Sequence, residues 1–472
     1  MKKILFVTAE CAPFIRSGGL GDVAGALPQA LSAIGDETRV ILPLYEDIPE
    51  AYRKDMEFVG SVTVQLCWRN QYAGLFRYAT NGATVYFIDN EYYFKRKGLY
   101  GHFDDGERFA FFSKAVLQVL PLTKFKPDII HVNDWQSALL PVMLDSCYRK
   151  EELYKKIKTV LSIHNIEFQG EMSPYVIGDI FGLPRDAYRI VEHKGNANML
   201  KAGIESANAV VAVSKTYAEE IKSPYFAYGL EGILNARAAK LHGIVNGIDT
   251  EVYNPATDKA LFAKYTENTV AKKSACKSGL QELLGLSLGD FPLIGMVTRL
   301  TSQKGIDLVL AVAEQILCLG TQLVILGTGE WKYENGLTEL AKRYPGKMAV
   351  KIGFSGDLAS KIYSGVDLFL MPSKFEPCGL SQMIAMRYGT IPIVRETGGL
   401  KDTVPAYNPV DMTGAGITFK TYNAHDMLDA VNRAVALYNE PAHRKAIIAN
   451  AMSADYSWTA SAKKYAELYE KL

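Results

Sequence analysis

The segment Val366–Gln382 has the sequence VDLFLMPSKFEPCGLSQ. Its first six residues, Val366–Met371, form an apolar run typical of a buried parallel strand, and a helix is expected to begin near Gly379. One carboxylate, Glu376, lies in the loop between them. In open α/β sheets, ligands bind at the carboxyl ends of the strands. The sequence therefore predicts that the loop Ser373–Gln382 holds the reacting part of a substrate.

The length and composition indicate an ordinary globular chain of two domains. A chain of 472 residues is too long for one hydrophobic core. Hydrophobic residues make up 48% and charged residues 22%, which are ordinary values. The net charge of +1 gives no electrostatic support for binding to nucleic acid or to an anionic membrane. Any anionic ligand must therefore be met by local cations.

The expected location of the protein is cytoplasmic. The N-terminal apolar run ends at Val7, which is too short for a secretion signal, and no apolar run approaches the length of a membrane span. The six cysteines are scattered without C-x-x-C spacing, and this favours reduced thiols.

Strand and helix patterns alternate in two stretches of the chain, which predicts α/β domains with parallel sheets covered by helices on both faces. In the first stretch, strand patterns lie at Lys2–Thr8, Thr38–Tyr45, Asp128–Val132, Thr159–Ile163, Ala209–Val213 and Leu241–Val245, and helical patterns lie at Leu20–Ile34, Arg108–Leu120 and Trp135–Cys147. Residues 57–86 are expected to form strands or hairpins. A linker-like segment, Asn246 to about Asp290, follows. In the second stretch, strand patterns lie at Leu293–Val297, Gln322–Leu326, Met348–Ile352, Val366–Met371 and Ile391–Val394, and a final helix is expected at Thr459–Leu472.

One short glycine-rich sequence occurs twice, and its two copies are called the first and the second glycine loop. SGGLGD at Ser17–Asp22 is similar to TGGLKD at Thr397–Asp402, and each is expected to follow a strand and open a helix. Equivalent positions in two similar domains would put both loops on facing sheet edges, which predicts a ligand-binding cleft between the domains. Neither loop is a G-x-G-x-x-G fingerprint or a P-loop.

Two cations follow the strand pattern Leu293–Val297. Arg299 and Lys304 lie in the loop before a helix N-terminus, an arrangement that suits a pyrophosphate group. The alternative is a solvated pair of surface residues. Phe354, after another strand pattern, is either a stacking surface for a nucleotide base or part of the core.

Polar side chains also follow strands of the first stretch. Asp22 follows the first glycine loop, and Asp134 and His164 lie at the carboxyl ends of strands. For His164 the alternative is a hydrogen-bonded structural residue. No second histidine lies at ligand spacing and no Asp-x-Asp motif is present, so no metal site is predicted. G-x-S-x-G is also absent, and Cys378 is interpreted as a small packing residue rather than a nucleophile.

Several segments match one known family in order and spacing. The most specific are NGID (Asn246–Asp249), TSQKG (Thr301–Gly305) and FEPCGL (Phe375–Leu380). The others are Arg16–Leu31, Tyr100–Ala115, His131–Leu139, Ser162–Gly170, Phe226–Leu234, Val245–Pro255 and Thr397–Val404. Nearly from end to end, the chain resembles the bacterial glycogen synthases and the related plant starch synthases.

The resemblance implies a GT-B architecture, in which two Rossmann-like, doubly wound parallel-sheet α/β domains face each other across a deep cleft. The implied domains are residues 1–245, the acceptor domain, residues 246–457, the nucleotide-sugar-binding domain, and residues 458–472, a C-terminal helix that crosses back to the first domain. The implied reaction transfers glucose from ADP-glucose to the non-reducing end of an α-1,4-glucan such as glycogen, with retention at the anomeric carbon. It implies no metal, no other cofactor, and no nucleic-acid or membrane partner.

The resemblance also implies roles for individual residues. The implied catalytic residues are Glu376, His164, Arg299 and Lys304, with the two cations on the diphosphate and Glu376 on sugar hydroxyls. The implied substrate-binding residues are Arg16, Gly18, Gly19, Asp22, Asp134, Asn246, Phe354, Cys378, Gly379, Leu380, Thr397, Gly398 and Gly399. Of these, Phe354 is expected against the adenine and Asp134 near the acceptor.

The first glycine loop departs from the usual family pattern, which is Lys-Thr-Gly-Gly-Leu. Here Arg16 and Ser17 replace the first two residues. Arginine keeps the positive charge but presents it as a planar fork, which can contact phosphate bidentately. The Glu-x7-Glu pattern of many retaining GT-B enzymes is also incomplete, because Ile384 stands eight residues after Glu376, as expected for this subgroup.

Two alternatives stay open. One is another sugar-nucleotide GT-B enzyme that uses UDP-glucose, because only the resemblance favours ADP-glucose. The other is a non-catalytic glucan-binding protein on a GT-B scaffold. The presence of every charged residue of the motifs argues against this second alternative.

Overall fold

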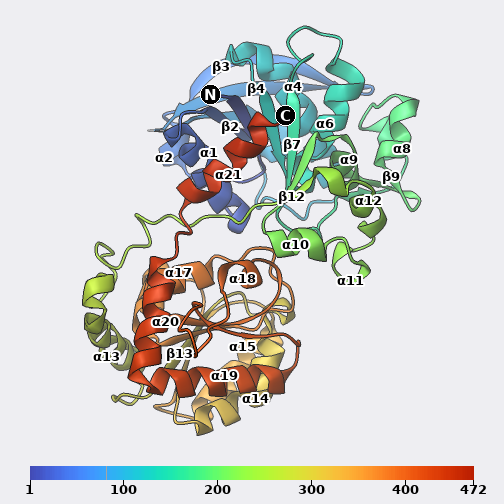
Figure 1. Ribbon diagram of the computed structural model, residues 1–472. Coiled ribbons are helices and arrows are strands. Elements are labelled where there is room, and N and C mark those ends of the chain that lie inside the picture. The colour runs from blue at the N-terminus through green and yellow to red at the C-terminus, as the bar shows by residue number, and fades with distance from the viewer. Residues whose placement is uncertain (81) are drawn as a thin grey trace. The chain divides into compact units, whose positions relative to one another are not determined.

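The strands form two main sheets, each in its own unit of the chain (Figure 1). The computed structural model describes residues 1–80 and 82–472. Unit 1 comprises Met1–Gly247 together with Trp458–Leu472, and unit 2 comprises Ile248–Ser457.

Unit 1 is built, within its described residues, on a nine-stranded sheet in the order β12-β11-β7-β6-β1-β2-β5-β4-β3. Neighbouring strands from β12 to β5 run parallel, and β4 and β3 add an antiparallel hairpin at one edge. The strands are β1 (Lys3–Val7), β2 (Glu37–Pro43), β3 (Glu57–Leu66), β4 (Arg69–Ala79), β5 (Thr84–Asp89), β6 (Ile129–Asn133), β7 (Lys158–Ile163), β11 (Ala209–Ala212) and β12 (Leu241–Gly243). The strand order reverses between β1 and β6, which makes their carboxyl ends a switch point of the kind that binds ligands.

Helices connect these strands. They are α1 (Gly19–Ala33), α2 (Glu50–Arg53), α3 (Glu91–Phe94), α4 (Asp105–Val119), α5 (Asp134–Ser137), α6 (Leu139–Met143), α7 (Val176–Asp179), α8 (Tyr188–Val191), α9 (Met199–Ser206), α10 (Lys215–Glu220), α11 (Pro224–Ala227), α12 (Glu231–Ala236) and the final α21 (Trp458–Glu470). A small antiparallel sheet comprises β8 (Glu171–Met172), β10 (Asn196–Asn198) and β9 (Glu192–His193).

Unit 2 contains a six-stranded parallel sheet in the order β15-β14-β13-β16-β17-β18. In chain order this is the 3-2-1-4-5-6 arrangement of dinucleotide-binding Rossmann folds, with the switch point between β13 and β16. The strands are β13 (Leu293–Val297), β14 (Gln322–Gly327), β15 (Met348–Ile352), β16 (Leu368–Met371), β17 (Ile391–Arg395) and β18 (Ile417–Phe419). The helices are α13 (Lys273–Leu284), α14 (Ile306–Cys318), α15 (Trp331–Arg343), α16 (Gly356–Gly365), α17 (Ser381–Arg387), α18 (Gly398–Thr403), α19 (Ala424–Asn439) and α20 (Pro441–Ser453).

The core of unit 2 gathers apolar side chains from the sheet and from one face of each covering helix. On α14, the buried residues Val309, Val312 and Ile316 recur at a spacing of three or four. This spacing gives the helix an apolar stripe toward the sheet. The strand residues Leu368 and Leu370 of β16 belong to the same core. The strand that leads into the Glu376 loop is therefore anchored in the core of unit 2.

The last helix, α21, packs on α1 within unit 1 (Figure 1). Its Tyr469 hydroxyl lies 2.6 Å from Nδ1 of His131 in β6, and Nε2 of His131 lies 2.7 Å from the Ser162 hydroxyl. Burial lowers the pKa of His131 to about 3, so its imidazole is neutral at pH 7. This buried network attaches the last helix to the sheet of unit 1.

The prediction of α/β domains with parallel sheets is confirmed. The interpretation of residues 246–290 as a linker was wrong in part, because this segment contains the twelve-residue helix α13. The single helix predicted at Trp135–Cys147 is divided into α5, α6 and a π-helical turn. Pro141 lies in α6, and proline removes a backbone donor that a continuous helix would use.

Candidate active site

A buried ion pair joins two loops at the switch point of unit 2. Lys304, in the loop after β13, places Nζ 2.6 Å from Oε2 of Glu376, in the loop after β16. The Ser373 hydroxyl donates to the same oxygen at 3.0 Å. Because these two charged side chains are only 15% and 7% exposed, their attraction is screened less than that of a surface pair. Within the described chain Oε1 of Glu376 accepts no hydrogen bond, so it can accept one from a ligand.

The backbones of these two loops are in direct contact. The Lys374 N–H donates to the carbonyl oxygen of Gln303 at 2.8 Å. Gly305 has a left-handed φ of +73°, and a Cβ at this position would lie 2.3 Å from the carbonyl oxygen of Pro372. Glycine is therefore required at this position, since it alone permits the close approach that brings the two loops together.

The second glycine loop, which opens α18, contacts the Glu376 loop. The Gly399 N–H donates to the carbonyl oxygen of Glu376 at 3.0 Å. A Cβ on Gly398 would lie 1.9 Å from that oxygen, and one on Gly399 would lie 2.1 Å from the Cys378 carbonyl oxygen. Thr397, just before these glycines, is buried, as is Cys378. The loop thus positions Glu376, and the Gly399 N–H is already used within the protein.

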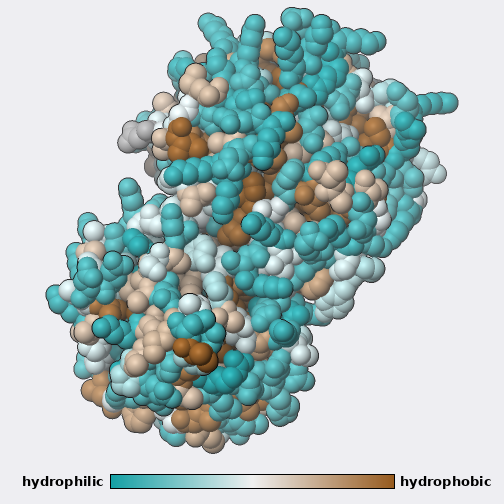
Figure 2. Space-filling model, viewed as in Figure 1, coloured by the Kyte–Doolittle hydropathy of each residue, from teal (hydrophilic) through white to brown (hydrophobic). Residues whose placement is uncertain are grey.

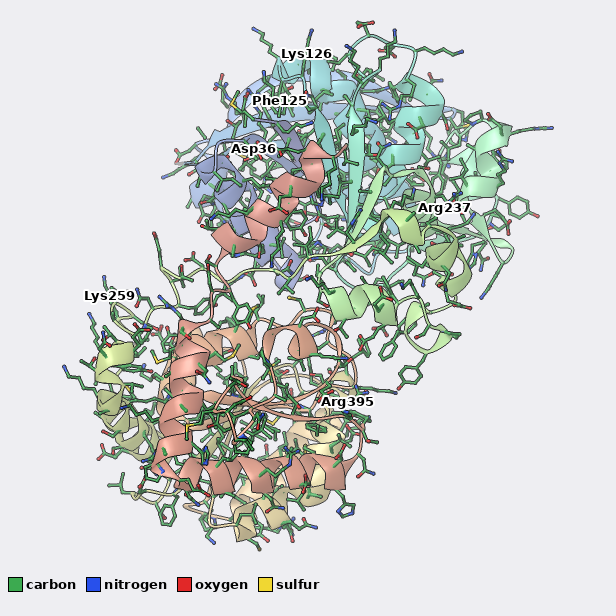
Figure 3. All side chains as sticks on the ribbon, in the orientation of Figure 1. Asp36, Phe125, Lys126, Arg237, Lys259 and Arg395 are labelled. Atoms are coloured by element: carbon green, nitrogen blue, oxygen red, sulfur yellow. The ribbon has the colours of Figure 1, made fainter. Side chains whose placement is uncertain are left out.

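Two residues that sequence reasoning missed also hold these loops. Arg395, at the end of β17 and labelled in Figure 3, donates to the carbonyl oxygen of Lys374 at 2.6 Å. Gln382 of α17 is fully buried. Its Nε2 donates to the Gly379 carbonyl oxygen at 2.9 Å and lies 3.0 Å from the Thr403 hydroxyl of α18. The available signal was an amide side chain directly before the apolar run Met383–Met386 at the start of a helix.

The remaining predicted residues of unit 2 are open to ligands. The guanidinium of Arg299 is exposed, and its one hydrogen bond among the described residues is to Gln303 at 3.4 Å. Phe354 is 83% exposed, so it is not part of the core. The N–H groups of Gly379 and Leu380 donate to no other group of the described chain. These groups can therefore offer one cation, a ring and two backbone donors to a bound molecule.

In unit 1, a buried carboxylate that sequence reasoning missed holds the first glycine loop. Glu10, three residues after β1, is 3% exposed. It accepts hydrogen bonds from the Ser17 hydroxyl at 2.7 Å, the Gly18 N–H at 3.3 Å and the Tyr100 hydroxyl at 2.6 Å. A carboxylate inside an apolar segment after a strand was the signal for this role.

The first glycine loop itself is exposed. Arg16 and Asp22 form an ion pair across it, with side chains 53% and 36% exposed. Such a surface pair is weak, so either partner is available to a ligand. A Cβ on Gly18 or Gly19 would meet nothing within 4 Å. Packing within unit 1 therefore does not require glycine here, and close approach of another group would explain it.

Asp134 and His164 meet at the carboxyl ends of β6 and β7. Oδ1 of Asp134 accepts hydrogen bonds from the backbone N–H of His164 at 2.7 Å and from the backbone N–H of Asn165 at 3.4 Å. Asp134 has a φ of +51°, which is uncommon outside glycine and marks a constrained position. Nε2 of His164 lies 2.9 Å from Oδ1 of Asn133, whose Nδ2 donates to Val7. The imidazole therefore carries its proton on Nε2.

Burial shifts the pKa values of these two groups in opposite directions. It raises the pKa of the Asp134 carboxyl to about 7, although the two N–H donors favour the charged form. It lowers the pKa of His164 to about 4. At neutral pH, His164 is an uncharged hydrogen-bonding group and Asp134 is close to its midpoint.

Replacement of Asp134 by asparagine is expected to raise the melting temperature by a few degrees at pH 8 and by much less at pH 5. Between the unfolded pKa, near 4, and the folded pKa of about 7, the folded wild type holds a proton that the unfolded chain has lost. Wild-type stability therefore falls as the pH rises through this window, whereas asparagine does not titrate. Melting curves of both proteins at several pH values measure the difference. The matched control is Asp22→Asn in the exposed ion pair, and a pH-independent gap for Asp134→Asn would contradict the argument.

Asn246, near the end of the first segment of unit 1, is buried, and its Oδ1 has no partner in the described chain. Such an unsatisfied acceptor is unusual inside a protein. Among the described residues, no group of three or more His, Cys, Asp or Glu side chains could hold a metal ion. The described helices include none with the length and apolar character needed to cross a membrane.

Comparison with known families defines the class of this protein. Residues 3–236 match the starch synthase catalytic domain, and residues 286–453 match glycosyl transferases group 1. Together with the two parallel α/β sheets, these matches identify a glycosyltransferase of the GT-B type. The chain belongs to the glycogen synthase family. The predicted family, fold class and enzyme class are thus confirmed.

The relatives match along their whole length. The chain is 48% identical to the glycogen synthase of Anoxybacillus flavithermus, covering 100% of this chain and 98% of the relative. It is 49% identical to that of Clostridium acetobutylicum, covering 99% of both. The solved catalytic domain of Starch Synthase IV from Arabidopsis thaliana, bound to ADP and acarbose, has a TM-score of 0.91 at 33% identity, covering 100% of this chain and 99% of that chain. A sucrose-phosphate synthase from Thermosynechococcus elongatus shares the fold, with a TM-score of 0.63 at 17% identity and coverage of 100% of this chain and 99% of that one.

Proposed function

We propose that this glycosyltransferase moves glucose from ADP-glucose to the non-reducing end of an α-1,4-glucan, with retention of configuration. The observation that carries the proposal is the buried pair of Lys304 and Glu376 at the switch point of unit 2. It puts a cation for a diphosphate beside a carboxylate with one free oxygen for sugar hydroxyls. The relative solved with ADP and acarbose supports a nucleoside diphosphate and an oligosaccharide as ligand classes.

Unit 2 binds the donor in this proposal. Lys304 and the exposed Arg299 neutralise the diphosphate, and the ring of Phe354 stacks on the adenine. Glu376 and the unbonded N–H groups of Gly379 and Leu380 hold the glucose. The second glycine loop acts mainly by fixing the Glu376 loop, because its Gly399 N–H is already bonded.

Unit 1 binds the acceptor. Asp134 accepts hydrogen bonds from hydroxyls of the glucan end, and the neutral His164 offers a hydrogen bond to the substrate. The open first glycine loop leaves room for a substrate to approach Gly18 and Gly19 closely, and the exposed Arg16 offers its guanidinium to an anionic group of that substrate. Asn246 has a buried acceptor that a substrate hydroxyl would satisfy.

The proposed reaction is a same-face substitution. The bond from the anomeric carbon to the phosphate oxygen breaks first, giving an oxocarbenium-like state. The acceptor 4-hydroxyl then forms the new bond on the same face and passes its proton to the departing phosphate oxygen. The Glu376 side chain is held by the ammonium of Lys304 and the hydroxyl of Ser373, which suits a group that positions a sugar rather than one that attacks it. Glu376 therefore orients the sugar.

The deciding experiment is the release of ADP or UDP from the two glucose donors with glycogen present. The proposal expects ADP release from ADP-glucose that depends on glycogen, and much slower UDP release. Faster turnover of UDP-glucose would favour the alternative donor. No nucleotide release from either donor would favour a non-catalytic glucan-binding scaffold. Anomeric analysis of the first product separately tests retention.

The cellular setting follows from the same proposal. The expected partners are ADP-glucose and glycogen, with no metal, no cofactor, no nucleic acid and no membrane. A cytoplasmic location and a role in glycogen biosynthesis complete the proposal. If no metal is needed, the activity is expected to persist after treatment with a strong metal chelator.

A further inference from the structure

Trp68 is an exposed aromatic side chain with a fixed orientation. It lies in the turn between β3 and β4 and is 68% exposed. Its indole Nε1 donates to Oδ1 of Asp179 at 3.1 Å, and the guanidinium carbon of Arg69 lies 4.2 Å from the ring centroid. A large ring that is already oriented loses little conformational entropy when a ligand stacks on it.

The turn that carries Trp68 lies at the same edge of the sheet as the proposed acceptor residues. Strand β5 runs parallel to β1 and β6 and ends at Asp89, which is paired with Gly74 of β4. From Gly74 the antiparallel β4 extends back to Arg69, five residues past this level. At roughly 3.3 Å per residue, the hairpin projects on the order of 16 Å beyond the carboxyl edge.

The segment Tyr100–Glu107 links this turn to the first glycine loop. At one end, the Tyr100 hydroxyl lies 2.6 Å from Glu10, which holds the glycine loop. At the other end, Glu107 in the first turn of α4 lies 3.4 Å from Nε of Arg69. Between them Phe103 is fully exposed. Two exposed aromatic rings thus follow one path from the proposed acceptor site to the hairpin turn.

We propose that Trp68 stacks on a glucose ring of the acceptor glucan, at a distance from the reacting end, and that Phe103 contacts the chain between them. The C–H face of a glucose ring is apolar and its rim carries hydroxyls. Here the guanidinium of Arg69 covers one face of the Trp68 ring and the carboxylate of Asp179 holds its edge, so the sugar stacks on the opposite face, with both charged groups near its hydroxyls. This inference rests on the proposed function, because it needs the acceptor on unit 1.

A protein partner fits the same surface less well. Protein interfaces need a contiguous patch of several hundred Å², and the two side chains in contact with the Trp68 ring, Asp179 and Arg69, are both charged. On the face of the molecule that Figure 2 shows, hydrophilic residues predominate and apolar residues lie among them in small groups. A long, neutral polysaccharide needs only isolated rings along its path.

The test compares a long acceptor with a short one. For Trp68→Ala the KM for glycogen is expected to rise about fivefold or more, the effect of losing one stacked ring. The KM for maltotriose, the KM for the donor and kcat are expected to stay at wild-type values, because a short acceptor does not reach the turn. Trp68→Phe keeps a ring but loses the hydrogen bond to Asp179, so its KM for glycogen should lie between those of the wild type and Trp68→Ala.

Phe58→Ala is the matched control, since Phe58 is 53% exposed on the same hairpin at its opposite end. Its KM for glycogen is expected to equal the wild-type value. Co-sedimentation of wild type and Trp68→Ala with glycogen, without any donor, tests the inference even if ADP-glucose is not the donor. An unchanged affinity for glycogen in a folded Trp68→Ala protein, an equal loss with maltotriose, or a change of oligomeric state in light scattering would overturn the inference.

Discussion

Replacing Lys304 with alanine is expected to lower kcat by about a hundredfold or more, with a smaller change in the KM for the donor. The charge on the departing diphosphate grows as the sugar–phosphate bond breaks, so a buried cation there stabilises the transition state more than the bound substrate. In the proposed site Lys304 supplies this cation, since its side chain is 15% exposed and its Nζ lies 2.6 Å from Oε2 of Glu376. Steady-state kinetics with ADP-glucose and glycogen measures the effect.

The same change also leaves the Glu376 carboxylate without its cation. A buried charge that loses its partner costs about 3–5 kcal/mol of stability. This loss of stability can be measured separately from the loss of turnover. Glu376→Gln removes the negative charge at nearly constant shape, so the double variant should recover much of the stability but none of the turnover. Lys374→Ala, in the same loop but exposed, is the control and should retain wild-type kcat. Near-normal turnover of Lys304→Ala would remove this residue from the proposed mechanism.

The strands and their ends could be predicted because they depend on local patterns. A parallel strand covered by helices on both faces must be apolar throughout, and β16 with the sequence LFLM shows this. Once strands alternate with helices, their carboxyl ends share one edge of a sheet. Lys304 and Glu376, 72 residues apart, could therefore be assigned to one site before their 2.6 Å contact was known.

The helix α13 could not be predicted because two lysines lie on its buried face. Lys273 is buried, and its ammonium donates to the Ser364 carbonyl oxygen at 2.6 Å and the Thr390 hydroxyl at 2.7 Å. Lys277 pairs with the buried Asp367 at 2.8 Å. Burial lowers the pKa of Lys273 to about 7. Apolar periodicity is the usual signal of an amphipathic helix, and here residues distant in sequence provide the partners that replace it.

The supporting residues of the site were missed for a related reason. Glu10 and Gln382 contact no expected substrate group, and their importance comes from the loops that they hold. A motif marks residues that approach a ligand, whereas a side chain that positions a loop is recognised only when its hydrogen bonds are known. The two glycine loops also show that sequence alone does not reveal such contacts. SGGLGD and TGGLKD are similar in sequence, but the adjacent glycines of the first have no neighbour within 4 Å of an added Cβ, whereas those of the second lie against backbone oxygens.

Gly398→Ala is expected to destabilise unit 2 by about 3 kcal/mol, which lowers its melting temperature by about 10 °C. The φ of +44° at this position disfavours any side chain, and the added Cβ would lie 1.9 Å from the carbonyl oxygen of Glu376. That oxygen belongs to the backbone and cannot rotate away, so the Glu376 loop must move. A displacement near 1 Å of a group that positions the reacting sugar lowers turnover by about a hundredfold, and the surviving folded protein should show this loss.

Gly356→Ala is the matched control in the same unit, because its added Cβ would meet nothing within 4 Å at the start of α16. Wild-type stability and turnover are expected for it. Gly19→Ala in the first glycine loop should also melt like the wild type, since nothing lies within 4 Å of its added Cβ. If Gly19→Ala nevertheless loses turnover, the glycine there serves substrate approach, whereas Gly398 serves the fold of the Glu376 loop. Wild-type melting and turnover of Gly398→Ala would refute this division, because two loops of nearly the same sequence would then have the same tolerance.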